Sequence, residues 1–192
     1  MTECQSEPPV GCTARRLWLR KVVGIAIIGL SDPSAAEEPS PSTLPPQPGD
    51  QLTVSGERSL IPADVMLNAP PLLVYPRDPL SGVVRDGSRL NQILLIKLDI
   101  KTLDDTTRVR AAEGIVAYSG ICTHAACAVS EWKGETRHLL CPCHNSEYDV
   151  SGHANVVAGP APRPLPALPL SIAGQYLIVQ GAFTAKVGLK KL

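Results

Sequence analysis

Aromatic side chains, net charge and long hydrophobic runs are all scarce in this sequence. It has one phenylalanine, two tryptophans and four tyrosines, so a core must be built mainly from Leu, Ile, Val and Ala. The formal net charge is zero, and composition therefore indicates neither a nucleic-acid partner nor a broad acidic one. The apolar run near the N-terminus, residues 22–30, is much shorter than the roughly 20 residues that cross a bilayer.

The first 36 residues are organised like an export signal. A basic stretch precedes the apolar run, and a small-residue site ending at Ala36 follows it. The pair Arg15 and Arg16 resembles a twin-arginine signal, a route that exports proteins already folded around a cofactor. We therefore expect export to the periplasm with cleavage after Ala36. Three alternatives remain: another export route, an uncleaved anchor that would associate the chain with a membrane, or no export.

Two further parts follow this signal. Residues 37–60 are rich in proline and lack apolar periodicity, which predicts an extended linker. Residues 61–192 are expected to form one β-rich domain, with a single short helix over 104–112. Apolar runs and alternation predict strands at 72–75, 92–100, 115–118, 137–140, 168–172 and 176–180. Residues 132–134 are expected to lie in a hairpin loop, with His138 in a strand and His153 in a turn.

Four of the six cysteines lie in two short motifs, each after an expected strand. Each motif pairs a thiolate with an imidazole, so that one Cys and one His from each loop can converge on a metal centre. The motifs are Cys122-Thr-His124-Ala-Ala-Cys127 and Cys141-Pro-Cys143-His144-Asn-Ser146-Glu-Tyr148.

Two kinds of metal site use two Cys and two His. Zinc is one, but zinc sites usually group Cys with Cys and His with His, and zinc would leave Cys127 and Cys143 without a role. A [2Fe–2S] cluster with two Cys on one iron and two His on the other is the Rieske arrangement.

The double motif resembles that of the Rieske proteins with two extra cysteines. The similarity to exported bacterial Rieske proteins extends from about residue 115 to about residue 188.

This resemblance implies an all-β fold with little helix. The fold would be a Rieske-type antiparallel β-sandwich with a small cluster-binding subdomain inserted at about residues 119–154. The proline-rich stretch 159–166 resembles the loop that covers the cluster in this family. The resemblance implies a [2Fe–2S] cofactor whose ligands, one pair for each iron, are Cys122 with Cys141 and His124 with His144.

The resemblance also assigns roles to the remaining motif residues. Cys127 and Cys143 would form a disulfide that joins the two loops. Ser146 and Tyr148 would donate hydrogen bonds to cluster sulfur, which stabilises the reduced cluster and raises its reduction potential.

Three positions depart from the pattern of quinol-oxidising cytochrome bc1 and b6f Rieske subunits. Those proteins usually carry Leu-Gly after the first histidine, with the Leu at the quinol pocket, whereas this chain carries Ala125 and Ala126. They usually carry Gly after the second histidine, whereas this chain has Asn145, which tolerates positive φ better than most residues. They also need a full membrane-spanning anchor, which the apolar run 22–30 is too short to form. These differences weigh against a bc1 subunit.

The sequence as a whole therefore predicts one-electron transfer through a Rieske cluster in the periplasm, to or from a c-type cytochrome or a dehydrogenase. The alternative is the Rieske subunit of a larger oxidoreductase, cytochrome bc1-like or arsenite-oxidase-like. A ferredoxin of a ring-hydroxylating oxygenase is disfavoured, because those proteins are cytosolic and lack the disulfide. No nucleophile–base pair is evident, so we expect no catalytic residues and no stand-alone enzyme.

Overall fold

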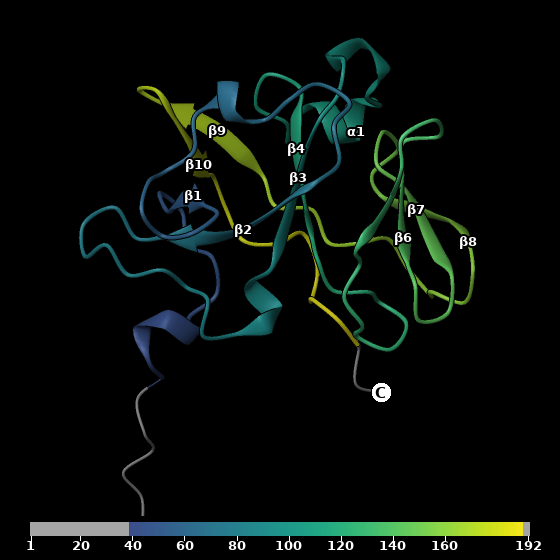
Figure 1. Ribbon diagram of the computed structural model, residues 1–192, viewed down its shortest axis with the longest axis horizontal. Coiled ribbons are helices and arrows are strands. Elements are labelled where there is room, and N and C mark those ends of the chain that lie inside the picture. The colour runs from purple at the N-terminus through teal and green to yellow at the C-terminus, as the bar shows by residue number, and fades with distance from the viewer. Residues whose placement is uncertain (1–38, 190–192) are drawn as a thin grey trace, which may run out of the picture. The chain divides into compact units, whose positions relative to one another are not determined.

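The computed structural model describes residues 39–189, and their fold consists almost entirely of antiparallel β-structure (Figure 1). The larger sheet has six strands in the order β4-β3-β2-β1-β10-β9. They are β1 Gln51–Thr53, β2 Leu72–Arg77, β3 Ile93–Lys97, β4 Ile115–Ser119, β9 Leu170–Ala173 and β10 Tyr176–Val179. The smaller sheet consists of β5 Glu131–Lys133, β6 His138–Cys141, β7 Ser146–Asp149 and β8 Asn155–Ala158.

Helical structure is limited to single turns within residues 39–189. The α-helix α1 spans only Asp105–Arg108, and four 3-10 turns lie at Pro41–Thr43, Pro62–Asp64, Arg89–Asn91 and Ile100–Thr102. None of the helices described is long and apolar enough to cross a membrane. The prediction of an antiparallel β fold with an inserted small sheet and little helix is confirmed. The expected export signal, residues 1–36, lies outside the described residues.

Strands β3 and β4 are buried on both faces, and this places the small sheet. Alternate side chains belong to two separate hydrophobic cores, because successive residues of a strand point to opposite faces. One face packs inside the curved larger sheet through Ile93, Leu95, Ile115 and Ala117. The other packs against the small sheet through Leu94, Ile96, Val116 and Tyr118. The small sheet is therefore fixed to the outer face of β3 and β4, which explains why residues 93–96 are apolar on both sides.

The folded domain begins before residue 61, inside the segment expected to be a linker. Strand β1 pairs with β2 on one side and with β10 on the other, and Leu52 is fully buried in the core. Just before it, Asp50 forms a buried ion pair with Arg85, with Oδ2 to Nε at 2.7 Å. A strand of three residues has too little alternation to stand out among prolines, so the pairing partners reveal it only in the fold.

Other predicted boundaries also shift. The helix expected over 104–112 is a single turn, which Asp104 caps by accepting a hydrogen bond from the Thr107 N–H at 2.6 Å. Trp132 lies in β5 opposite Leu139, not in a hairpin loop. The small sheet continues to Ala158, beyond the expected end of the inserted subdomain near residue 154. Strands β5, β7 and β8 were not expected, because their sequences, Glu-Trp-Lys, Ser-Glu-Tyr-Asp and Asn-Val-Val-Ala, show little apolar alternation.

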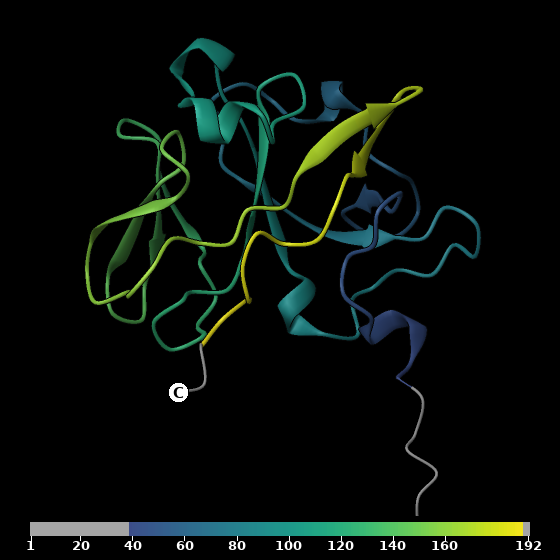
Figure 2. The same ribbon diagram turned by 180° about the vertical axis from the view of Figure 1, so that it is seen from behind.

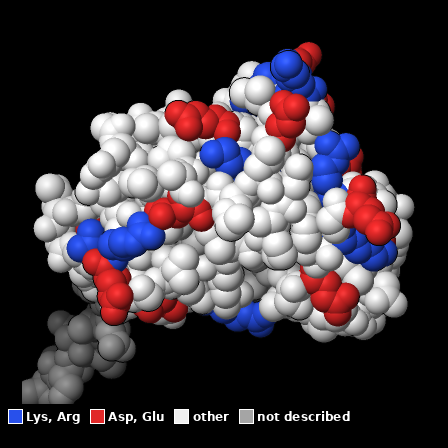
Figure 3. Space-filling view, turned by 45° about the horizontal axis from the view of Figure 1, so that its top comes forward, with Lys and Arg blue, Asp and Glu red and all other residues white. Residues whose placement is uncertain are grey.

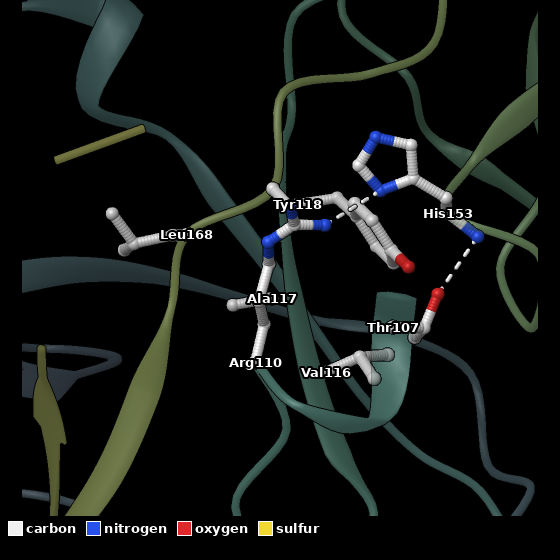
Figure 4. A pocket seen from close by; sticks show the side chains of 8 residues that line it. Thr107, Arg110, Val116, Ala117, Tyr118, His153 and Leu168 are labelled. Carbon is white, nitrogen blue, oxygen red and sulfur yellow. Dashed lines mark hydrogen bonds between the residues drawn. The ribbon is translucent and has the colours of Figure 1, made fainter. Parts of the chain in front are cut away.

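The turn between β7 and β8 is fastened to the larger sheet at the end of the small sheet away from the cysteine motifs. The Arg110 guanidinium Nη1 lies 3.0 Å from Nδ1 of His153, and the His153 N–H donates to the Thr107 hydroxyl at 2.8 Å (Figure 4). The Tyr118 hydroxyl donates to the Val150 carbonyl at 2.9 Å. These groups border a cavity of about 10 Å³, roughly the volume for one water molecule.

Acid should weaken the attachment of the turn between β7 and β8 to the larger sheet. Burial, and then the neighbouring Arg110 charge, lower the pKa of His153, while Asp104 acts in the opposite direction. The folded protein therefore takes up this proton less readily than the unfolded chain, whose histidine titrates near pH 6.5. The stability that depends on neutral His153 is present above about pH 6.5 and is lost as the pH falls towards the lower folded-state pKa.

We expect His153→Gln to lose less stability on acidification than the unchanged protein does. The glutamine amide can still accept a hydrogen bond from Arg110 but does not titrate. Urea unfolding at pH values on both sides of the histidine pKa measures the change in the free energy of unfolding for each protein. Equal losses for the variant and the unchanged protein would show that His153 does not titrate in this way.

Candidate metal-cluster site

Two loops at the other end of the small sheet carry the motif residues. The first loop follows β4, and the second is the tight turn that joins β6 to β7. Cys122 and Cys141 are each only 1 % exposed, whereas His124 is partly exposed and His144 is exposed. The site therefore has its thiols in the protein interior and its imidazoles towards the surface.

The two imidazole rings face each other across the loops. Nδ1 of His124 lies 3.2 Å from Nδ1 of His144, and the rings are nearly perpendicular with centroids 4.6 Å apart. Two nitrogens bound to one tetrahedral metal at about 2.0–2.1 Å would be roughly 3.3 Å apart. The spacing of the two ring nitrogens is therefore that of two ligands on one metal ion.

The four cysteines divide into a disulfide and two free thiols. Cys127 and Cys143 are joined, with their Cα atoms 6.5 Å apart, which confirms the expected disulfide. The sulfurs of Cys127, Cys141 and Cys143 lie within 4.8 Å of one another, but a disulfide sulfur is not a thiolate ligand. Among the described residues, Cys122 and Cys141 are the thiols left to bind a metal.

Tyr148 connects the two loops through the Cys122 sulfur. Its hydroxyl is fully buried and lies 3.2 Å from the Cys122 Sγ. Burial, and then the adjacent Cys122, raise the pKa of Tyr148. The hydroxyl therefore keeps its proton and can donate a hydrogen bond to the sulfur. The Thr123 N–H and hydroxyl also lie 3.3 Å from this oxygen. Sequence reasoning gave Thr123 no role, although the motif included it.

The two free thiols are in different environments. Burial raises the pKa of the Cys141 thiol. Burial also acts to raise the pKa of Cys122, but hydrogen bonds from the Tyr148 hydroxyl and the His124 N–H outweigh it, and the pKa is lowered. A metal binds the thiolate form, so losing the proton is less favourable for Cys141 than for Cys122.

The Ser146 hydroxyl supports a sulfide-containing cluster. It is fully buried, and its oxygen has no hydrogen-bond partner among residues 39–189. A buried hydroxyl without a partner costs about 1–3 kcal/mol. An acceptor such as a cluster sulfide between the loops would satisfy it, whereas a single zinc ion offers no acceptor. The donor set of the site thus fits a [2Fe–2S] cluster.

The proline-rich stretch 159–166 touches both loops. A Cβ on Gly159, which has φ of +82°, would lie 2.5 Å from the Asn145 carbonyl oxygen, so the stretch packs directly against the second loop. The Thr123 hydroxyl donates to the Arg163 carbonyl at 2.7 Å, which ties the stretch to the first loop. Asn145 has a φ of +56°, so the turn that this asparagine was expected to tolerate is present.

Two other histidines stay outside the site, as expected. His138 lies in β6 and is bonded through Nδ1 to the Glu147 carboxylate at 2.6 Å. His153 lies in the fastened turn at the far end of the sheet. Fold and site together define a protein that holds a metal cluster between two Cys-His loops on a small β-sheet.

Comparison with known proteins identifies this class. Residues 93–169 match the Rieske [2Fe-2S] domain family. The cytochrome bc1 complex Rieske iron-sulfur subunit of Streptomyces lividans is 40 % identical over 98 residues, which cover 50 % of this chain and 58 % of that protein. The chain is therefore a Rieske [2Fe–2S] domain protein related to the Rieske subunits of cytochrome bc1 complexes.

Other relatives carry related descriptions. A protein named as a candidate Rieske subunit of respiratory nitrate reductase, from Haloferax mediterranei, is 33 % identical over 137 residues, covering 70 % of this chain and 59 % of that protein. The chain thus spans less than two thirds of both of these relatives. Among solved structures, a chain of a hyperthermophilic respiratory complex III is 24 % identical with a TM-score of 0.42, covering 62 % of this chain and 71 % of that one.

Replacing Tyr148 with Phe should lower the reduction potential. The change removes a donor to the Cys122 sulfur, and a hydrogen bond that favours the reduced cluster by about 1.4 kcal/mol corresponds to about 59 mV for one electron. Protein-film voltammetry measures the shift. Tyr118→Phe is a matched control, because it loses a buried hydrogen bond to the Val150 carbonyl and none to sulfur. An unchanged potential in Tyr148→Phe would exclude this hydroxyl from tuning the cluster.

Proposed function

We propose that this chain is the Rieske electron-transfer component of a larger oxidoreductase, with a [2Fe–2S] cluster bound by Cys122, His124, Cys141 and His144. The observation that carries the proposal is that the two sides of the site offer different ligands. Buried free thiols lie on one side, and two adjacent imidazoles lie near the surface on the other. When bound, such a cluster accepts and releases single electrons.

The surrounding protein residues then have three separate roles. The exposed imidazole edge of His144 and the partly exposed one of His124 offer the short route by which an electron enters or leaves. Ser146 and Tyr148 favour the reduced state by donating to sulfur. The disulfide between Cys127 and Cys143 holds the two loops together while the charge at the site changes.

The names of the relatives support a multi-subunit assembly. They describe subunits of cytochrome bc1 complexes and a candidate subunit of a respiratory nitrate reductase. The partner would be another redox subunit, such as a c-type cytochrome or a dehydrogenase. An arsenite-oxidase-like assembly would use the same site in the same way.

A free-standing periplasmic carrier is the second candidate function. Ala125 favours it, because this exposed residue presents only a methyl group where quinol-oxidising subunits usually carry Leu. Such a tip would bury less surface in a quinol pocket. Charged side chains of both signs lie interspersed on the face in Figure 3, and much of that face carries neither, so it presents no patch of one sign to a strongly charged partner.

We propose that the protein acts in the periplasm. A disulfide forms and persists in oxidising compartments, and the pair Cys127–Cys143 supports this location. The basic and apolar pattern of residues 1–36 supports export, with membrane association if that segment is retained.

Affinity purification tests the proposal. The tagged chain is isolated in mild detergent from cells that naturally produce it, and co-purifying proteins are identified and quantified by mass spectrometry. We expect other redox subunits in stoichiometric amounts. Recovery of the chain alone from the soluble periplasmic fraction, able to reduce a c-type cytochrome, would favour the free-standing carrier instead.

A further inference from the structure

Arg163 carries a positive charge that no other described residue neutralises, and it lies beside the first cluster loop. We propose that this charge sets the reduction potential of the cluster by favouring the reduced state. The inference rests on the proposed function, since it requires a cluster bound between the two loops.

The backbone of Arg163 is directly attached to the first loop. Its carbonyl accepts a hydrogen bond from the Thr123 hydroxyl at 2.7 Å, and Thr123 stands between Cys122 and His124. The same hydroxyl lies 3.3 Å from the Tyr148 oxygen, which contacts the Cys122 sulfur. Arg163 is therefore separated from both first-loop ligands by a single intervening residue.

The side chain of Arg163 is held by the C-terminal segment, residues 184–189. Its Nη2 donates to the Lys186 carbonyl at 2.7 Å and to the Gly188 carbonyl at 2.5 Å. Gly188 is buried, and a Cβ built on it would lie 3.4 Å from Ile121 and 3.6 Å from Ala126. In Figures 1 and 2 this segment, drawn in yellow, runs to the edge of the domain where the first loop lies. The guanidinium is thus held by a segment that itself packs against the first loop.

The charge of this guanidinium is not balanced locally. Its partners are neutral carbonyl groups, and Nη1 is buried with no hydrogen-bond partner among residues 39–189. None of the ion pairs in this part of the chain includes Arg163. An unpaired charge in a poorly solvated position acts over a longer distance than one in water. Gaining an electron adds one negative charge to the cluster, so a fixed positive charge nearby stabilises the product of reduction.

Arg89 offers a matched comparison on the same loop. Its guanidinium donates to the Ala126 carbonyl at 2.5 Å, but the residue is exposed. Water and salt screen an exposed charge, so its effect on the cluster should be smaller. Arg163 is partly buried, with its Nη1 atom buried, so the two arginines separate the effect of a partly buried charge from that of any arginine bonded near this loop.

Four variants test the proposal: Arg163→Gln and Arg163→Met, which remove the charge; Arg163→Lys, which keeps it; and Arg89→Gln, the control. The midpoint potential is measured by voltammetry, and cluster assembly by EPR and by iron and sulfide content. We expect a downward shift in both neutral Arg163 variants, larger than in Arg89→Gln, and a potential near that of the unchanged protein in Arg163→Lys. The methionine variant keeps an apolar stem, so that one neutral variant remains if the other does not fold.

Hydrogen exchange of residues 184–189 gives a readout that does not depend on the cluster. Exchange should rise most in Arg163→Met, because its thioether donates no hydrogen bond to either carbonyl of the segment. Neutral variants whose potential shifts no more than that of Arg89→Gln would overturn the inference, as would an equal shift in Arg163→Lys. Absence of the cluster signal from the unchanged protein would instead refute the proposed function.

Discussion

His144→Ala and His124→Ala should each abolish the low-average-g EPR signal of a cluster with mixed Cys and His ligands. The Nδ1 atoms of these residues lie 3.2 Å apart, and no other described histidine reaches the site. Removing either leaves one iron with a single imidazole and an open coordination position. The measurement is the EPR spectrum of the reduced protein, together with its iron and acid-labile sulfide content, which should be equal in the unchanged protein.

His138→Ala is the control for this prediction. His138 belongs to the same small sheet, but its ring bonds to Glu147 and takes no part in the loops, so the signal should persist. Stoichiometric zinc without sulfide in the unchanged protein would contradict the cluster assignment. A full signal in His144→Ala would contradict the ligand set.

Cys127→Ala should cost about 3 kcal/mol of stability and leave the cluster assembled but labile. The disulfide joins residues 16 positions apart, and closing a loop of roughly this length lowers the entropy of the unfolded chain by about that amount of free energy at 25 °C. The cluster becomes labile because the two loops are no longer joined beside it. Urea unfolding measures the loss of stability, and the decay of cluster absorbance measures the lability.

The partner cysteine supplies the control. Cys143→Ala removes the same bond, so its loss of stability should match that of Cys127→Ala, and the double variant should lose no more than either single one. Additive losses would mean that the two side chains contribute separately and not through their bond. Mass spectrometry that finds both thiols free in native protein would also contradict this account.

Strands with clear apolar alternation were predictable from the sequence, and strands without it were not. The hairpin of β9 and β10 shows alternating apolar residues around a turn, and it forms close to the expected positions. Strand β1 has three residues and depends on partners more than 20 positions away, and the Asp50–Arg85 ion pair beside it joins residues 35 positions apart. Such elements are stabilised by distant segments, so a local pattern contains little sign of them.

The chemical groups of the site were readable from local sequence, since each thiol and imidazole lies within a few residues of the next in its motif. The surroundings of these groups were not. That the Ser146 hydroxyl is buried without a partner depends on how β7 packs. That Arg163 contacts Gly188 depends on where the chain returns after β10. Neither fact follows from spacing along the chain.

The sequence by itself determined which ligand types this protein offers, because thiols and imidazoles at close spacing are a property of the two motifs. Only the tertiary structure decided which cysteines form the disulfide and which remain free to bind a metal. A single disulfide among these four clustered cysteines could join any of six pairs, and the fold selects Cys127 with Cys143 while leaving Cys122 and Cys141 as buried free thiols. The physical reason is distance: a disulfide needs two Cα atoms within about 7 Å, and two loops more than ten residues apart in the chain meet only when β4 and the small sheet pack together.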